Sequence, residues 1–111
     1  MKYFVRCGER RGTCYHEFFA GEWDGKTFWK EDSLLLHDDV LSKSDGFWRA
    51  LAGAIAGYDP FAAVAVSRKE WETVGALIDP GDDVAREMYR EANEWVESAF
   101  ASHGRFTILG I

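Results

Sequence analysis

The first third of the chain alternates short apolar and aromatic runs with polar, glycine-containing stretches. The runs at residues 2–7 and 14–19 are separated by a polar segment with two glycines, which favours two strands joined by a hairpin loop. Asp24-Gly25 is typical of a second hairpin turn and predicts a third strand over residues 26–30. Residues 33–37 contain three successive leucines, a run too short for periodicity to separate strand from helix.

From about residue 45 onward, apolar residues recur at the three- and four-residue steps of helices. A first helix is predicted from Asp45, its N-cap, to Gly57. The face opposite its apolar stripe consists of small residues, which indicates that other parts of the protein pack against most of its sides. Ser67 and Glu70 match a capping box, which predicts a second helix reaching Ile78. The residues expected to face inward on these helices are Phe47, Trp48, Leu51, Ile55, Tyr58, Trp71, Val74 and Ile78.

The longest predicted helix follows the break at residues 79–82 and ends near Ser102. Two nearly continuous apolar runs enclose the second and third helices. Residues 61–66 have the pattern of a strand buried on both faces, and residues 106–111 predict a final strand. The inward positions of the third helix are Val84, Met88, Ala92, Trp95, Val96 and Ala99.

These elements predict an α+β fold in one domain spanning residues 1–111. N-terminal antiparallel hairpins are followed by a helix and then by a strand–helix–helix–strand unit. We expect a single mixed sheet packed with about three helices. A long helical connection separates the last two strands, so they are expected to pair in parallel through a right-handed crossover.

Composition narrows the functional classes. The 111 residues include 13 Lys+Arg and 19 Asp+Glu, for a net charge of −6, and 47% are apolar, which argues against disorder. An acidic chain is a poor candidate for nucleic-acid binding. Arg6 interrupts the start of any secretory signal, and no apolar run has the length of a membrane span. With only two cysteines, a cytoplasmic protein without a membrane anchor is expected.

Cys7 and Cys14 are expected to be small core-side residues. If the first hairpin pairs them, it also pairs Val5 with His16 and Tyr3 with Phe18, which gives a mostly apolar face. A cross-strand disulfide between the two cysteines is the alternative. The spacing is not that of a zinc site, so no metal and no cofactor is expected.

No nucleophile motif, phosphate loop or metal-binding loop occurs in the chain. His16 and His37 are interpreted as ordinary histidines. They also provide the first alternative function, a small enzyme or ligand-binding domain whose site gathers His16, Glu17, His37 and Asp38. A homo-oligomeric structural subunit, joined through the small residues of the first helix, is the second alternative.

Charge is unevenly distributed along the chain. Residues 1–30 carry six basic and four acidic side chains, whereas residues 31–66 carry two and six, and residues 79–111 carry three and seven. The last segment predicts an acidic face for a basic partner. Trp23, at a turn, is a candidate exposed aromatic contact. The expected partner-binding residues are Asp82, Asp83, Glu87, Glu91, Glu94 and Trp23.

The whole chain resembles, in general profile, the immunity proteins of bacterial polymorphic toxins, including those of contact-dependent inhibition systems. The resemblance rests on the helix start Ser67–Trp71, the acidic segment Asp79–Glu97 and the apolar ending Phe106–Ile111. It implies a small, cytoplasmic, non-enzymatic α+β protein that blocks a cognate toxin domain. A nuclease-like toxin would be a basic partner of the kind that an acidic face attracts.

Overall fold

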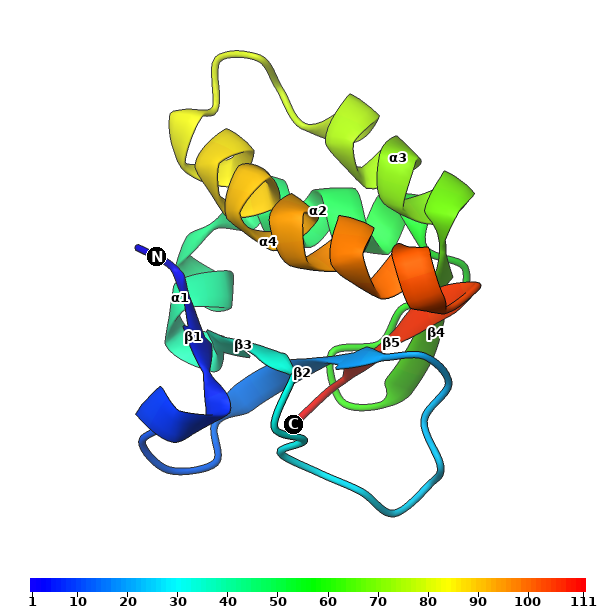
Figure 1. The fold of residues 1–111 in the computed structure, drawn as a ribbon. Helices are drawn as coiled ribbons and strands as arrows, with labels where there is room; N and C mark the ends of the chain where they lie inside the picture. The colour runs from blue at the N-terminus through cyan, green and yellow to red at the C-terminus, as the bar shows by residue number, and fades with distance from the viewer.

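Five strands form one sheet, and helices lie over one of its faces (Figure 1). The computed structural model describes residues 1–111. The strands are β1 (Phe4–Arg6), β2 (Tyr15–Ala20), β3 (Leu34–His37), β4 (Ala63–Ser67) and β5 (Arg105–Leu109). The α-helices are α1 (Asp38–Lys43), α2 (Asp45–Ala54), α3 (Arg68–Leu77) and α4 (Asp83–Ser102), and a short 3-10 helix, η1, covers Cys7–Glu9.

The sheet order is β1-β3-β2-β5-β4, and every neighbouring pair is antiparallel. The predicted α+β class is confirmed, whereas the mixed sheet with a parallel final pair is wrong. The reason lies in the helical connection, because α3 leads away from the end of β4 and α4 leads back to it. Arg105 therefore pairs with Ser67, where β4 ends, and β5 must run in the opposite direction.

The predicted N-terminal hairpin is also wrong, because β3 lies between β1 and β2. Val5 pairs with Leu35, and His16 pairs with Leu36. The leucines of β3 are wholly buried, which is consistent with a strand that has neighbours on both sides. Both cysteines are free thiols: Cys7 donates from Sγ to the Lys30 carbonyl at 2.9 Å, and Cys14 is exposed.

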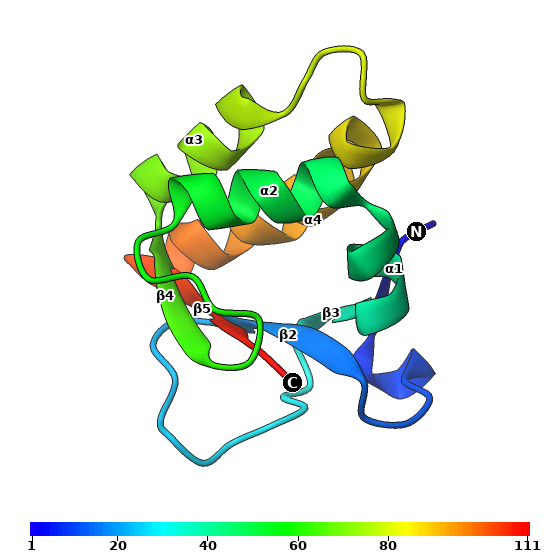
Figure 2. The same cartoon turned by 180° about the vertical axis from the view of Figure 1, so that it is seen from behind.

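The third predicted strand, residues 26–30, is absent. The segment belongs to a long loop, residues 21–33, on the opposite side of the sheet from the helices (Figure 2). Glu17 explains its path, because the Glu17 carboxylate accepts hydrogen bonds from the backbone N–H groups of Trp29 and Lys30 at 2.8 and 2.9 Å. Trp29 has a φ of +59°, a left-handed conformation that no strand residue adopts.

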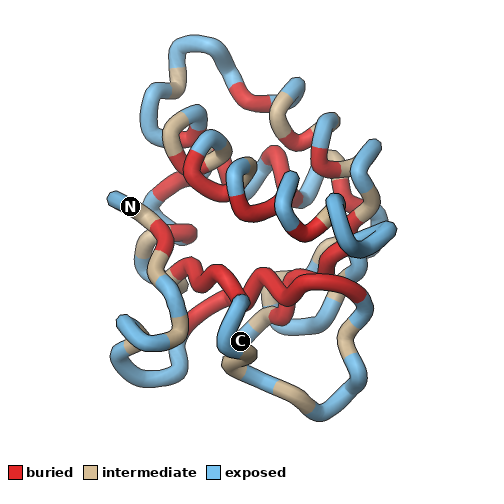
Figure 3. Tube along the Cα trace, in the orientation of Figure 1, coloured by how far each residue is buried: buried red, intermediate tan, exposed pale blue.

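The core lies between the sheet and the helices, as the buried segments in Figure 3 show. Phe18 is at its centre and contacts Trp71, Trp95 and Phe106 with ring centroids 5.6–6.3 Å apart. The α3 capping box is confirmed, with Ser67 and Glu70 each accepting from the other's backbone N–H. None of the helices combines the length and the apolar character that a membrane span requires.

Several predictions of burial are wrong. Val84, expected inward on α4, is 45% exposed, and Cys14, expected on the core side, is exposed as well. Residues 61–66 were expected in a strand buried on both faces, but β4 is an edge strand and its Ala63 and Ala65 are exposed. Trp48 was expected in the core, but α2 packs only its Phe47 and Leu51 side inward and leaves Trp48 in contact with solvent. The small-residue back of α2 is largely exposed as well.

Candidate functional site

The acidic residues predicted on α4 have different local roles. The side chain of Asp82 caps the helix by accepting from the Ala85 N–H at 3.0 Å. Glu91 is only 9% exposed, and its carboxylate accepts from the backbone N–H groups of Lys2, Tyr3 and Phe4 at 2.9–3.2 Å. Glu91 thus holds the N-terminal strand against α4 and is not free to contact a partner.

Neighbouring arginines neutralise much of the remaining charge on α4. Glu87 is bonded to Arg90, and this hydrogen bond lowers the pKa of Glu87. The only ion pair of Asp83 is a long one to Arg86, at 3.9 Å, and Glu94 forms no ion pair. Asp83 and Glu94 are therefore the predicted α4 residues that remain most available to a partner.

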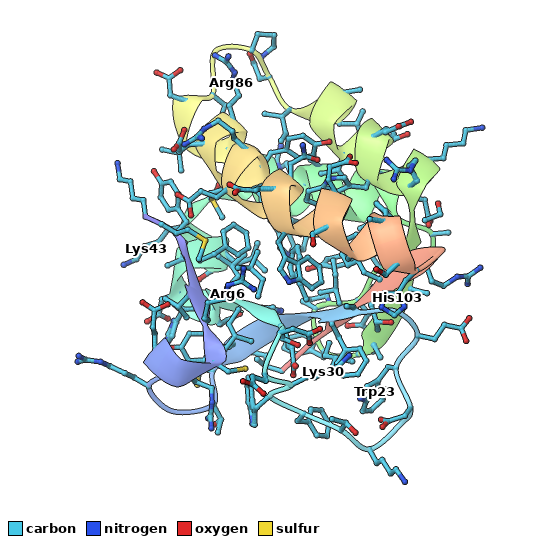
Figure 4. All side chains as sticks on the ribbon, viewed as in Figure 1. Arg6, Trp23, Lys30, Lys43, Arg86 and His103 are labelled. Atoms are coloured by element: carbon cyan, nitrogen blue, oxygen red, sulfur yellow. The ribbon has the colours of Figure 1, made fainter.

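Trp23 is half-buried, and its side chain contacts other residues of its own loop. Its Nε1 donates to the Thr27 carbonyl at 2.6 Å, and its ring packs against Phe28 at 5.3 Å. The Thr27 hydroxyl bond lowers the pKa of Asp24, in the same turn, to about 2. Trp23 lies at the opposite end of the molecule from Arg86 near the start of α4, so Trp23 and this acidic end of α4 do not form one compact site (Figure 4).

The histidines do not converge. His16 is buried against the helices, and its Nε2 lies 2.8 Å from Asp38 Oδ1, while its Nδ1 has no partner. His37 pairs with Tyr15, which precedes His16 on β2. Because successive residues of a strand point to opposite faces, the His37 side chain lies on the other face of the sheet from His16. Its Nδ1 accepts from the Asp39 N–H at 3.0 Å and caps α1. Glu17 shares the His37 side and does not approach His16. No group of three or more potential metal ligands occurs.

A different surface stands out from the exposed side chains. Phe61 is 73% exposed, Phe28 54%, Ile111 43% and Trp48 38%. Phe61 and Trp48 line one hollow, and Phe28 and Ile111 line another. The Ile111 N–H donates at 3.1 Å to the carbonyl of Pro60, which precedes Phe61, so a residue of one hollow is hydrogen-bonded to a residue of the other. We call these four side chains the apolar strip.

The hollow at the Trp48 end has a volume of about 380 Å³ and lies between α1, α2 and the turn at Pro60. It is lined by Asp38, Leu41, Ser42, Asp45, Trp48, Pro60 and Phe61. The turn is held by Asp59, whose carboxylate accepts from the Phe61 N–H at 2.8 Å. Burial, reinforced by Asp38 and Asp59, raises the pKa of the nearby Tyr58 to about 12.

The charge beside this hollow is negative. Asp38 and Asp45 belong to its wall, and Asp59 adjoins it. Arg49 pairs with Asp45 at 2.9 Å, and Asp38 has only the His16 ring as a partner. Exposed aromatic rings next to carboxylates suit a partner that combines apolar and cationic groups.

Sequence reasoning missed the apolar strip because its residues were assigned to strands and to the core. One local signal was present: Phe61 directly follows the turn Asp59-Pro60, and turns lie at the surface. The contact between residues 60–62 and 110–111 is long-range and has no such signal. It depends on Gly110, where a Cβ atom would come within 2.3 Å of the Pro60 carbonyl oxygen.

Comparison with protein-family models, with curated proteins and with solved structures finds no match to this chain.

Proposed function

We propose that this protein is a non-enzymatic binding protein that captures a basic protein partner on the apolar strip and the adjoining carboxylates. One observation carries the proposal: four large apolar side chains are exposed and line two hollows, and a hydrogen bond between Ile111 and Pro60 joins residues of the two hollows. Exposed apolar side chains that gather in hollows mark interaction sites, and aromatic residues are enriched in binding hot spots.

The carboxylates beside the strip determine the expected charge of the partner. Asp38, Asp45 and Asp59 adjoin the aromatic side chains, and Arg49 is the one cation paired with any of them. Opposite charge on the partner would speed association and exclude acidic competitors. The exposed Asp83 and Glu94 of α4 add to the negative charge of the molecule.

The biological role that fits this chemistry is that of an immunity protein. A nuclease-like toxin must attract phosphate groups, so its active site is basic and complementary to an acidic, aromatic surface. The resemblance in profile to polymorphic-toxin immunity proteins supports the same role. In this proposal the protein acts in the cytoplasm and blocks the toxin by occupying its active site.

The geometry does not favour the alternative of an enzyme around His16 and His37. The Nε2 atom of His16 is hydrogen-bonded to Asp38, and its Nδ1 atom is buried without a partner. Neither ring nitrogen is therefore free to contact a substrate. A second copy of the chain is the competing occupant of the strip, and the experiment below separates the two.

Affinity capture from the source organism tests the proposal. We expect the wild-type protein to retain a basic protein, and Phe61→Glu to lose it, because an added carboxylate interrupts the strip without disturbing the core. Leu77→Glu is the matched control, since Leu77 is also an exposed apolar residue, at 52%, but lies on α3. Equal recovery by Phe61→Glu, or recovery of this chain alone as a dimer, would contradict the proposal.

A further inference from the structure

A second hollow, here the Glu17 cavity, lies between the 21–33 loop and the face of the sheet that the helices leave uncovered. Its volume is about 250 Å³, enough for a small organic group. Three aromatic residues from β2 and the loop contribute to its wall. The lining residues are Thr13, Tyr15, Glu17, Phe28, Trp29, Leu109, Gly110 and Ile111.

Glu17 is the one charged side chain among these residues, and its charge is not compensated. It is 1% exposed and forms no ion pair. Hydrogen bonds from the Trp29 and Lys30 N–H groups and from the Ser33 hydroxyl, at 2.6–2.9 Å, satisfy its oxygens. These donors are neutral, so no cationic side chain pairs with the carboxyl group in this site of low dielectric constant, where an opposite charge is strongly favoured.

The aromatic residues are held in place around this charge. Trp29 adopts its left-handed backbone conformation, a strained arrangement of the kind that occurs at functional sites. Tyr15 meets the Trp29 ring edge to face, with centroids 6.3 Å apart. The guanidinium of Arg10 lies 4.3 Å from the Trp29 ring centroid, yet Arg10 does not line the cavity. No cationic side chain therefore lines the cavity.

We propose that the Glu17 cavity binds a small organic cation of the alkylammonium class. Aromatic faces attract such cations through their quadrupole, and a cluster of rings with one carboxylate is a recognition site for ammonium and methylated ammonium groups. The alkyl part would contact Leu109 and Ile111. The cation has two sources, a free amine or the lysine side chain of a bound protein, and both supply the same chemistry.

The test is a titration of the full chain with n-butylammonium, followed through the backbone and indole NMR signals of Trp29 and the amides of Lys30 and Ser33. We expect saturable shifts at these positions and an affinity at least about fivefold higher than for neutral n-butanol at equal ionic strength. Equal affinities for the two compounds, or no saturable shift at Trp29, would overturn the proposal.

Variants separate binding from folding. Phe28→Ala should weaken n-butylammonium binding about fivefold, because it removes one ring, and Phe28 is exposed enough for the fold to persist. Leu77→Ala, outside both the cavity and the apolar strip, should leave the affinity unchanged. Glu17→Gln should abolish the preference for the cation over n-butanol. Unchanged binding by Phe28→Ala would count against the proposal even if Glu17→Gln fails to fold.

A competition arm distinguishes the two sources and rests on the proposed function. If saturating n-butylammonium weakens binding of the captured partner, a partner lysine occupies the cavity. If partner binding is unaffected while n-butylammonium still binds, the ligand is a free amine. Failure to capture any partner would remove the proposed function and leave the direct titration valid.

Discussion

Glu91→Ala is expected to lower the free energy of unfolding by about 3 kcal/mol. Three backbone N–H groups at the start of β1 lose their shared carboxylate acceptor, and hydrogen bonds to charged groups are worth about 1.5–3 kcal/mol each, with part of the loss recovered by water. The Phe4 N–H is buried and has no ready replacement. Chemical denaturation followed by circular dichroism measures the change.

Glu94→Ala is the matched control for this prediction. Glu94 lies one turn further along α4, is exposed and forms no ion pair, so its removal should change stability by less than about 0.5 kcal/mol. Amide exchange should also accelerate at residues 2–4 in the Glu91 variant alone. Similar effects of the two substitutions would mean that Glu91 does not hold the N-terminal strand.

The double substitution of Trp48 and Phe61 with alanine is expected to reduce affinity for the captured partner about 1,000-fold. Both side chains line the same hollow, and truncation of a hot-spot residue costs about 2 kcal/mol or more. Because both residues are exposed in the free protein, the free energy of unfolding should change little. Isothermal titration calorimetry measures the affinity.

The pair Leu77→Ala and Val84→Ala provides the control for this second prediction. Both residues are exposed apolar side chains outside the strip, and their joint removal should leave affinity within about twofold of wild type. An equal loss of affinity in the two double variants would indicate that general surface hydrophobicity, and not the strip, drives association.

Local sequence signals predicted the helical part of the fold well. The Ser67–Glu70 capping box and the apolar periodicity of α4 depend on residues three or four positions apart. The capping box was confirmed, and so were the inward positions of α4 apart from Val84, which is exposed. The buried aromatic core followed from the same periodicity, with Trp71 and Trp95 facing Phe18. These features need no knowledge of distant parts of the chain.

Long-range polar contacts explain most of what the sequence did not predict. Glu17 and Glu91 look like ordinary surface acids, yet each is buried and binds backbone N–H groups of a distant segment. Those contacts determine the course of the 21–33 loop and of the N-terminal strand. The apolar pattern also could not show that Trp48 and Phe61 lie at the surface, because exposure depends on which neighbouring elements cover a residue.

Amide hydrogen exchange of the partner complex shows whether the partner binds on the apolar strip, because it maps the contact face without a substitution. We expect protection on binding to concentrate around Trp48, Phe61, Phe28 and Ile111, while the solvent-facing side of α4 near Asp83 and Glu94 exchanges as in the free protein. Protection confined to α4, with the apolar strip unchanged, would contradict the proposed function.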